Sequence, residues 1–353
     1  MVKRTESGTS GPSIADVARE AGVATSTVSR ALTVPGRIAE PTRLKVEAAA
    51  RKLGYTGNQT ARNLRVGTTR TIMIVLPDVL YVGASQTVSE VLRAAAKGLS
   101  DLGFSLLIAN VSREAETDET ILRVALGGTV SGVLLMASDI PASNGRSLVE
   151  IGLPIASLHF DLSGQNIPSV ISDDFEAIAA ATRELVALGH RRFLYARGRP
   201  DNYHELERLR GVRQAIAGCG LAETALRLSQ GDFCFSGGVA VARDFLALPA
   251  GQRPTAVICA NDDTAIAFMK TVLDEGLEVP GDVAILGFDG APIAPFMTPA
   301  LSTIQQNCAE LGQRGAELIV DMVLGRYKGE VRRLVVPCTI VMRESVGPRT
   351  GAL

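Results

Sequence analysis

The stretch IADVAREAGVATSTVSRAL, Ile14 to Leu32, decides how the N-terminal part of the chain folds. In its first half, apolar residues recur at the spacing of one helical face, and a second periodic run follows with Val28 and Ala31 facing inward. Gly22 separates the two runs. We therefore predict two short helices joined by a tight turn, which is the outline of a helix-turn-helix.

Helices this short are not stable alone in water, so the pair needs a third element to pack against. Ser13 is the expected N-cap of the first helix. The later sequence PTRLKVEAAARKLGY, at 41–55, places Pro41 near the first turn of a third helix. One stripe of that helix is apolar, at Val46, Ala49, Ala50 and Leu53. We predict a small helical domain over 13–57, preceded by a flexible tail at 1–12.

The outward face of the second predicted helix carries Thr25, Ser26, Ser29 and Arg30. Such hydrogen-bonding groups can reach base edges when a helix enters a major groove, although a solvated surface is the alternative. Residues 1–66 contain eleven Lys and Arg against five Asp and Glu, a charge of +6, and the remainder carries −7. A basic N-terminal part on an acidic body indicates a polyanionic partner for that part alone.

The body of the chain alternates short apolar runs with helical patterns, which is typical of parallel sheets covered on both faces by helices. Its length exceeds one typical sheet, so we predict two lobes. The expected strands are at 71–78, 104–111, 131–137, 154–160, 191–198, 255–262, 283–289 and 332–342. The clearest expected helices are at 86–102, 175–188 and 264–275.

Several common kinds of chemistry find no support in the sequence. There is no phosphate-binding G-x-x-x-x-G-K-[ST], no G-x-G-x-x-G opening a helix and no G-x-S-x-G, so we expect no catalytic residues and no enzyme. The five cysteines and three histidines lack metal-ligand spacing, so we expect no metal and no cofactor. With no apolar leader and no apolar run of about eighteen residues, we expect a cytoplasmic protein without membrane contact.

Polar residues follow several of the expected strands. Ligands of parallel sheets bind beyond the carboxyl ends of the strands. The residues at such ends are Asp78, His159, Asn261, Asp262 and Asp289. Each of them has an alternative role as the cap of the following helix, but together they indicate a crevice lined by groups that bind hydroxyls.

The N-terminal sequence closely resembles the headpiece of the LacI–GalR family of bacterial transcription regulators. The resemblance rests on IADVAREAGVATSTVSRAL and on VEAAARKLGYTGNQTARNL at 46–64. It implies that Thr25, Ser26 and Arg30 contact bases, and that Thr27, Ser29 and Asn58 support phosphate contacts. It also implies a hinge over 58–70 that becomes helical on double-stranded operator DNA. The hinge contains Ala61 and Leu64, and Leu64 would wedge into the minor groove.

Two positions depart from the family pattern. The family usually places Ser at the caps of the second and third helices, whereas this chain has Ala24 and Ala39. Each lost cap is worth about 1 kcal/mol. We therefore hypothesise that the head is only marginally folded when it is not bound to DNA.

The resemblance continues along the body, at 168–174, 187–198, 208–216, 254–270, 279–290 and 341–345. It implies an effector-binding core like that of periplasmic sugar-binding proteins. Carried over by position, Arg208 is the central effector-binding cation, Asn261 and Asp289 hydrogen-bond the ligand, and Phe233 stacks on its apolar face. The further effector-binding candidates are Asp78, His159 and Gln306.

The effector itself stays open between a sugar, a sugar acid and a sugar phosphate. His159 stands where relatives often have Asp, Gly290 replaces a second Asp, and YVGA at 81–84 replaces N-P-F-F. Two carboxylates lost and an imidazole gained favour an anionic effector. The alternative is that His159 simply packs.

The resemblance also implies how the core is divided and assembled. The expected N-terminal lobe is about 71–170 plus 304–330, and the C-terminal lobe is about 171–303 plus 331–353. A homodimer without a coiled-coil tail is expected, using Val88, Val91 and Leu92 among other residues. The predicted protein is a repressor that binds pseudo-palindromic DNA under effector control. The alternatives are an activator, a corepressor-dependent regulator, a sugar-binding transport component and an enzyme acting on a sugar derivative.

Overall fold

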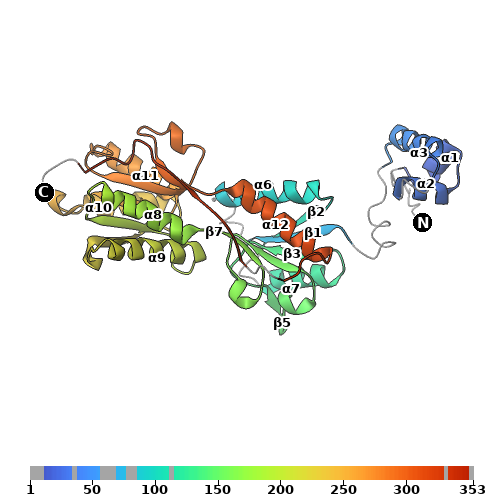
Figure 1. Ribbon diagram of the computed structural model, residues 1–353, viewed down its shortest axis with the longest axis horizontal. Coiled ribbons are helices and arrows are strands. Elements are labelled where there is room, and N and C mark those ends of the chain that lie inside the picture. The colour runs from blue at the N-terminus through green and yellow to red at the C-terminus, as the bar shows by residue number, and fades with distance from the viewer. Residues whose placement is uncertain are drawn as a thin grey trace, which may run out of the picture. The chain divides into compact units, whose positions relative to one another are not determined.

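The computed structural model describes residues 12–33, 38–55, 69–76, 86–110, 115–329 and 333–349. The chain divides into two compact units, Met1–Thr69 and Arg70–Leu353 (Figure 1). Four predicted site residues lie outside the described residues, and their roles stay predictions: Asn58, Ala61, Leu64 and Asp78. Most of the predicted tail and most of the predicted hinge also lie outside them.

The first unit contains the three predicted helices, α1 (Ile14–Ala21), α2 (Thr25–Thr33) and α3 (Glu40–Leu53). Ser13 caps α1 in a capping box with Asp16, as its side chain accepts from the Asp16 amide while the Asp16 carboxylate accepts from Ser13. Gly22 then ends α1 in the left-handed region at φ 63°, where glycine is favoured.

The core of the first unit is built from small side chains. No buried member is larger than valine, and the set is Val17, Ala18, Ala21, Val28, Ala31, Val46, Ala49 and Ala50. A core of this size buries little apolar surface, so we expect the unit to have a low free energy of unfolding. The predicted loss of one cap is confirmed, since Ala39 precedes α3 without any side-chain cap hydrogen bond.

The second unit contains two six-stranded sheets. The first has the order β13-β7-β6-β3-β1-β2 and is parallel throughout, and the second has the order β14-β12-β11-β10-β8-β9 with only β14 antiparallel. The first sheet comprises β1 (Thr71–Leu76), β2 (Ser105–Asn110), β3 (Gly132–Leu135), β6 (Ile155–Leu158), β7 (Ser169–Ser172) and β13 (Arg333–Val336). The second comprises β8 (Phe193–Arg197), β9 (Leu226–Gln230), β10 (Ala256–Cys259), β11 (Ala284–Asp289), β12 (Ser302–Gln305) and β14 (Thr339–Val341).

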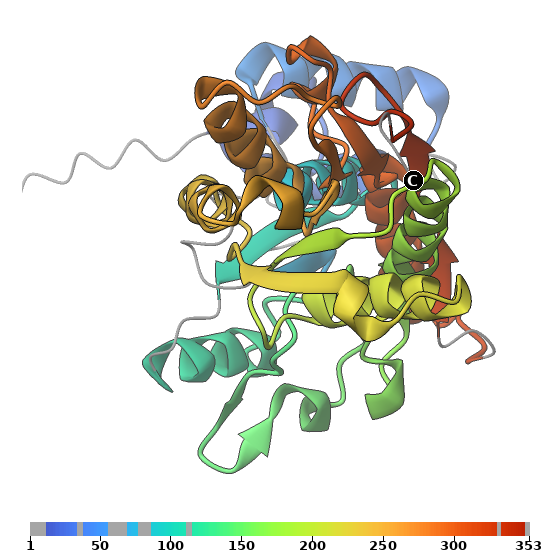
Figure 2. The same ribbon diagram turned by 90° about the vertical axis from the view of Figure 1, so that its left-hand side faces the viewer.

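The helices cover both faces of each sheet, as the alternating pattern predicts. The first sheet packs on α6 (Gln86–Asp101) and α12 (Cys308–Val323) on one face, and on α7 (Ala115–Leu126) on the other. The second sheet packs on α8 (Asp174–Ala187) and α9 (Tyr203–Gly218), and on α10 (Phe235–Leu246) and α11 (Asp262–Asp274). In Figure 2, α8 in green and α9 in yellow lie away from α10 in amber and α11 in orange. A short hairpin, β4 (Ala142–Ser143) and β5 (Arg146–Ser147), adjoins the first lobe.

The expected role of α6 in dimer contacts is wrong for two residues. Val88 and Val91 are buried inside the first lobe, in the same cluster as Leu311 and Ile319 of α12. Because these side chains already fill a core, they have no surface to offer to a second protomer. Leu92 is partly buried against the same cluster.

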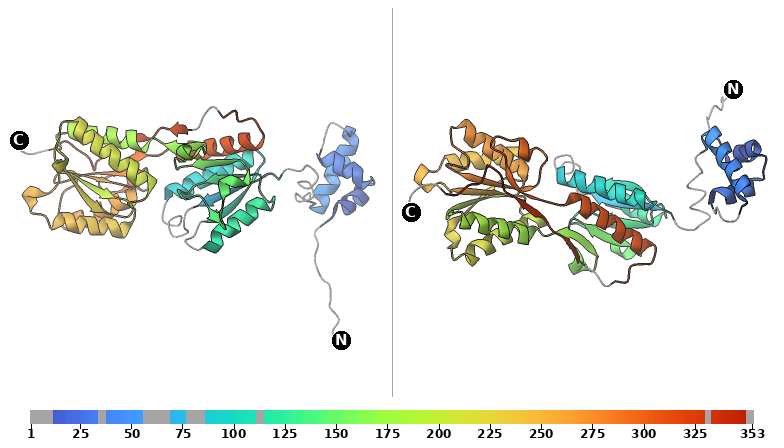
Figure 3. Two further views of the ribbon diagram at one scale, coloured as in Figure 1. Left: turned by 90° about the horizontal axis from the view of Figure 1, so that it is seen from below. Right: turned by 45° about the horizontal axis from the view of Figure 1, so that its top comes forward.

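The chain crosses between the lobes after β7, after β12 and after β13 (Figure 3). The expectation that 331–353 belongs wholly to the C-terminal lobe is wrong for β13, because β13 pairs with β7 of the first sheet. The sequence suggested one strand over 332–342. Pro337 and Cys338 instead separate β13 from β14, which lies in the other sheet.

Candidate DNA-binding helix and effector site

Helix α2 presents the polar face that the sequence predicts. Thr25, Ser26 and Arg30 are exposed and Ser29 is half-buried, whereas Val28 lies fully inside the core. The helix begins at the Ala24 carbonyl, which accepts from the Thr27 and Val28 amides at 2.9 and 3.1 Å. The exposed face of α2 therefore offers hydroxyl groups in its first turn and the Arg30 guanidinium in its last turn. Groups of this kind donate to base edges and phosphates.

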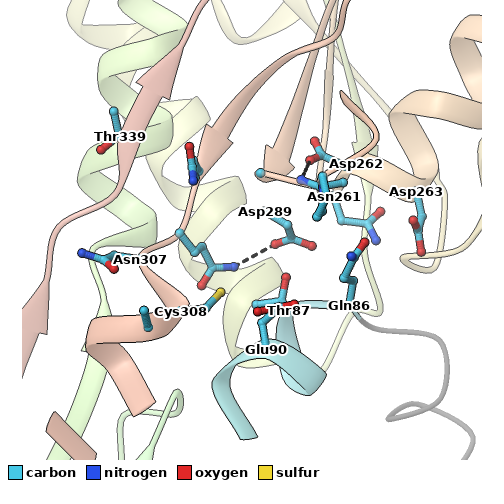
Figure 4. Close-up of a pocket in the computed structure, with 16 residues that line it drawn as sticks. Gln86, Thr87, Glu90, Asn261, Asp262, Asp263, Asp289, Asn307, Cys308 and Thr339 are labelled. Atoms are coloured by element: carbon cyan, nitrogen blue, oxygen red, sulfur yellow. Dashed lines mark hydrogen bonds between the residues drawn. The ribbon is translucent and has the colours of Figure 1, made fainter. Parts of the chain in front are cut away.

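A cavity of about 510 Å³ lies at the junction of the two lobes (Figure 4). Gln86, Thr87 and Glu90 reach it from the first turns of α6, and Asp289 reaches it from the end of β11. Its other lining residues are Asn261, Asp262, Asp263, Gly290, Ala291, Pro292, Gln305, Gln306, Asn307, Cys308, Ala309 and Thr339. The structure thus brings the predicted Asn261, Asp289 and Gln306 together, at the strand ends where ligands of parallel sheets bind.

Asp289 is the centre of the hydrogen bonding at this cavity. Its Oδ1 accepts from Gln306 Nε2 at 2.8 Å and lies 3.4 Å from Arg208 Nη2. Burial raises the pKa of Asp289, and the Arg208 charge opposes that rise. Figure 4 marks this hydrogen bond to Asp289 with a dashed line.

Arg208 is buried next to the cavity and is not one of the side chains that line it. Its Nε donates to Asp174 Oδ2 at 2.8 Å, and its guanidinium carbon lies 3.6 Å from the centre of the Phe288 ring. Burial alone would raise the pKa of Asp174, but Arg208 and His204 outweigh it and hold that pKa well below its usual range. The predicted central cation is therefore already neutralised by two carboxylates, Asp174 and Asp289.

His159 is buried at the end of β6, with a φ of 76°. Its Nε2 lies 2.9 Å from Gln306 Oε1, its Nδ1 has no hydrogen-bond partner, and its ring centre is 4.2 Å from that of His204. Burial lowers the pKa of His159 to about 3, with His204 acting in the same direction. His159 therefore both packs, as the sequence alternative proposed, and joins the hydrogen-bond network of Asp289.

Phe233 does not line the cavity in this structure. It is buried at φ 60° against Gly198, where an added Cβ would come within 2.0 Å of its ring. Asn261 lines the cavity and also fills the alternative role of a helix cap, since its Oδ1 accepts from the Thr264 amide at 3.1 Å. Its Nδ2 donates to the Phe233 carbonyl at 3.1 Å.

Both carboxylate oxygens of Asp262 form hydrogen bonds within the protein, so this residue mainly stabilises the local structure. Its two carboxylate oxygens accept from Thr303 Oγ1 and from the Ala291 amide, both at 2.6 Å. Burial raises the pKa of Asp262 to about 7, and repulsion from Asp289 adds to the rise. These bonds hold the loop after β11 against the start of α11.

Two residues of the network escaped the sequence analysis, Asp174 and His204. His204 Nδ1 lies 3.0 Å from Asp174 Oδ2, the same oxygen that binds Arg208. His204 offered a sequence signal, because it precedes Arg208 by one helical turn on α9. Asp174, the second residue after β7, offered none, because that strand was not predicted. Among the described residues, no three His, Cys, Asp or Glu side chains are grouped to hold a metal ion.

A helix-turn-helix unit and a two-lobed α/β core with a polar cavity at the lobe junction define the class of helix-turn-helix transcriptional regulators. The model of bacterial regulatory proteins of the lacI family matches residues 13–58, and the periplasmic binding protein-like domain matches residues 182–346. None of the helices in the described part of the chain could span a lipid bilayer by length and apolarity.

Comparison with individual relatives and solved structures indicates the same class of protein. The chain is 31% identical to the HTH-type transcriptional repressor CytR of Escherichia coli K12, over 94% of this chain and 95% of that protein. It is 29% identical to the repressor PurR of Photobacterium profundum, over 94% and 98%. It superimposes on the lac repressor dimer bound to operator and the anti-inducer ONPF with a TM-score of 0.81, at 24% identity over 95% and 99% of the chains. The CelR–cellobiose complex gives a TM-score of 0.69, at 28% identity over 95% and 100%. The chain belongs to the LacI family of DNA-binding transcriptional regulators.

Proposed function

We propose that this regulator is a repressor that binds a pseudo-palindromic operator as a homodimer. The observation that carries the proposal is the exposed polar face of α2 on a helix-turn-helix unit. CytR and PurR are both described as transcriptional repressors, and the similar lac repressor is a dimer on its operator. In a dimer the two recognition helices enter successive major grooves, about 34–36 Å apart.

The contacts with DNA divide by chemistry. Arg30, Thr25 and Ser26 read base edges, because their side chains are exposed on the recognition helix, Thr25 and Ser26 in its first turn and Arg30 in its last. Thr27, Ser29 and Asn58 position the protein on phosphates. The hinge residues Ala61 and Leu64 enter the minor groove, where an apolar wedge partly unstacks a base step.

The effector binds at the lobe junction, at Asn261, Asp289 and Gln306, with Arg208 and His159 behind them. This proposal is supported by the cavity and by the cellobiose bound to the similar CelR. A ligand that contacts both lobes favours one lobe orientation and changes the affinity for DNA. The coupling is reciprocal, typically about 1–3 kcal/mol. The protein acts in the cytoplasm, where bacterial DNA lies.

The test is selection of genomic fragments by the purified protein, followed by titration of the selected site with and without candidate sugars. Arg30→Ala should weaken binding about 10- to 100-fold and relax the base preference at one position, because a good base contact is worth about 1–3 kcal/mol. Arg51→Ala on α3 removes the same charge from an exposed position and serves as the control. Unchanged affinity and sequence preference in Arg30→Ala would contradict the proposed docking.

A further inference from the structure

Two imidazole rings from different lobes meet in a buried contact at the lobe junction. His159 directly follows β6 of the first lobe, and His204 lies in the first turn of α9 in the second lobe. Their ring centres are 4.2 Å apart, and the ring planes are tilted by 39°. Only 4% of the His159 surface and 2% of the His204 surface is exposed. The two lobes therefore touch through a pair of titratable side chains.

The contact extends to one neighbouring ring from each lobe. The centre of the Phe160 ring lies 5.1 Å from that of His204 and 6.3 Å from that of Tyr203. Phe160 is buried, and its carbonyl accepts from Ser157 Oγ of its own lobe at 2.7 Å. We call the four rings of His159, Phe160, Tyr203 and His204 the interlobe contact. It consists of packed rings, so its stability depends on the charge that the two imidazoles carry.

The two carboxylates near these rings are already bound by other groups. Asp174, in the first turn of α8, accepts from Arg208 Nε at 2.8 Å and lies 3.0 Å from His204 Nδ1. Asp289, at the end of β11, lies 3.4 Å from Arg208 Nη2 and accepts from Gln306 Nε2 at 2.8 Å. Neither carboxylate is therefore free to pair with an additional positive charge. The other titratable groups near the interlobe contact are Tyr203, Glu207, Asp161 and Arg333.

The neutral form of His159 fits this arrangement, whereas the charged form does not. Gln306 Nε2 donates to Asp289, so Gln306 Oε1 is an acceptor and His159 Nε2, 2.9 Å away, carries the ring proton. A second proton would have to bind Nδ1, which is buried and has no hydrogen-bond partner among the described residues. Burial, and after it the effect of His204, lowers the pKa of His159 to about 3.

We propose that the interlobe contact is a pH-sensitive switch, in which the two lobes separate more readily as the solution becomes acidic. The proposal goes beyond the proposed function, because it concerns the orientation of the lobes without DNA or effector. When the contact opens, His159 reaches water, and its pKa returns to the ordinary value of 6.5. A proton that binds mainly to the open form shifts the equilibrium towards that form.

The sign and size of the effect follow from this linkage. The pKa of His159 is lowered in the closed form, so closure is fully favoured above pH 6.5 and becomes less favoured as the pH falls towards 3. Between pH 7.5 and pH 5.5, the ratio of open to closed molecules should rise about tenfold.

The experiment measures how well position 160 is protected in the full-length protein. Phe160→Cys places a thiol in the interlobe contact, where an activated pyridyl disulfide reacts with it only after the contact opens. The rate at each pH is divided by that of a peptide of residues 155–165 with the same substitution, because the reactivity of a free thiol itself depends on pH. Mass spectrometry identifies which cysteines have reacted. The protection of the new thiol should fall about tenfold between pH 7.5 and pH 5.5.

Two histidine variants of this protein separate the switch from other effects of pH. His159→Gln retains an amide that can bond to Gln306 but takes up no proton, so it should abolish the pH dependence of protection. His190→Gln is the matched control, because His190 is also buried but contacts Thr255 and Gly347 within the second lobe. It should leave the tenfold change intact.

Global unfolding is monitored in the same samples by Cys259, which is fully buried in β10 and should stay protected at both pH values. Tyr203→Cys places the thiol on the other side of the contact and gives the same readout if Phe160→Cys does not fold. The proposal is refuted if protection of the new thiol does not change with pH, or if the change persists in His159→Gln. It is equally refuted if the new thiol and Cys259 lose protection together.

Discussion

Restoring the missing cap of α3 should stabilise the DNA-binding unit. Ala39 has φ −55° and ψ 135° and no side-chain cap, and Pro41 in the first turn has no amide hydrogen. The Thr42 amide, now 3.0 Å from the Ala39 carbonyl, is therefore the donor within reach of the hydroxyl oxygen that Ala39→Ser introduces. The expected gain is about 1 kcal/mol. In a domain of this size, that raises the melting temperature by about 4–8 °C.

Two further variants serve as controls for the effect of the cap. Ser13→Ala removes the capping box of α1, with its Oγ-to-Asp16 bonds of 2.6 and 3.3 Å, and should cost about 1 kcal/mol. Ala48→Ser makes the same exchange as Ala39→Ser at an exposed position inside α3, where it should cost about 0.5 kcal/mol through helix propensity.

The assay is thermal unfolding of residues 1–69, followed by circular dichroism, because this unit has its own core. The cap argument fails if Ala39→Ser melts no higher than Ala48→Ser. The hypothesis of a marginally folded head fails if the unchanged unit shows a cooperative transition well above room temperature. Since 1 kcal/mol changes the ratio of folded to unfolded molecules about fivefold, Ala39→Ser should also tighten operator binding if the head is marginally folded.

Three further outcomes are expected. Asp174→Asn should lower the unfolding free energy of the core by about 3–5 kcal/mol in urea titrations, because it leaves buried Arg208 short of a counter-ion; the exposed Asp201→Asn should change little. His159 has a pKa of about 3 in the folded state and 6.5 in the unfolded state. Its contribution to the stability of the fold is therefore fully present above pH 6.5 and is lost as the pH falls towards 3. His159→Gln should therefore reduce the loss of unfolding free energy between pH 6.5 and pH 3. The raised Asp262 pKa of about 7 has the opposite effect, because it lowers the unfolding free energy as the pH rises from 3.8, and Asp262→Asn should remove that loss. In fluorescence anisotropy, the affinity for operator DNA should fall steeply as the salt concentration rises, whereas the affinity for the effector should barely change. An operator affinity that does not depend on salt would argue against phosphate contacts.

The head could be predicted almost completely from its sequence. Its helices are local objects, and Gly22, the capping Ser13 and the apolar spacing all act within a few residues. The sheets were harder to predict. β7, β9 and β12 were missed because their short sequences, such as STIQ at 302–305, are as polar as loops. They become strands through pairing with neighbours that are distant in the chain.

The candidate site was predicted in part for the same reason. The rule of strand ends and the family resemblance placed Asn261, Asp289 and Gln306 together, which the structure also does. They could not show that Arg208 would be shared between Asp174 and Asp289, because that pairing joins residues 34 and 81 positions apart. The burial of Phe233 likewise depends on contact with Gly198, far away in sequence.

The repeated passage of the chain between the lobes has a consequence for synthesis on the ribosome. The sheet of the first lobe begins at Thr71, yet α12 over Cys308–Val323 and the edge strand β13 complete it only after the other lobe has been made. Until α12 has been synthesised, the apolar surface that this helix covers on the first sheet is therefore exposed in the nascent chain. The helical head needs no such late partner and can fold as soon as it leaves the exit tunnel.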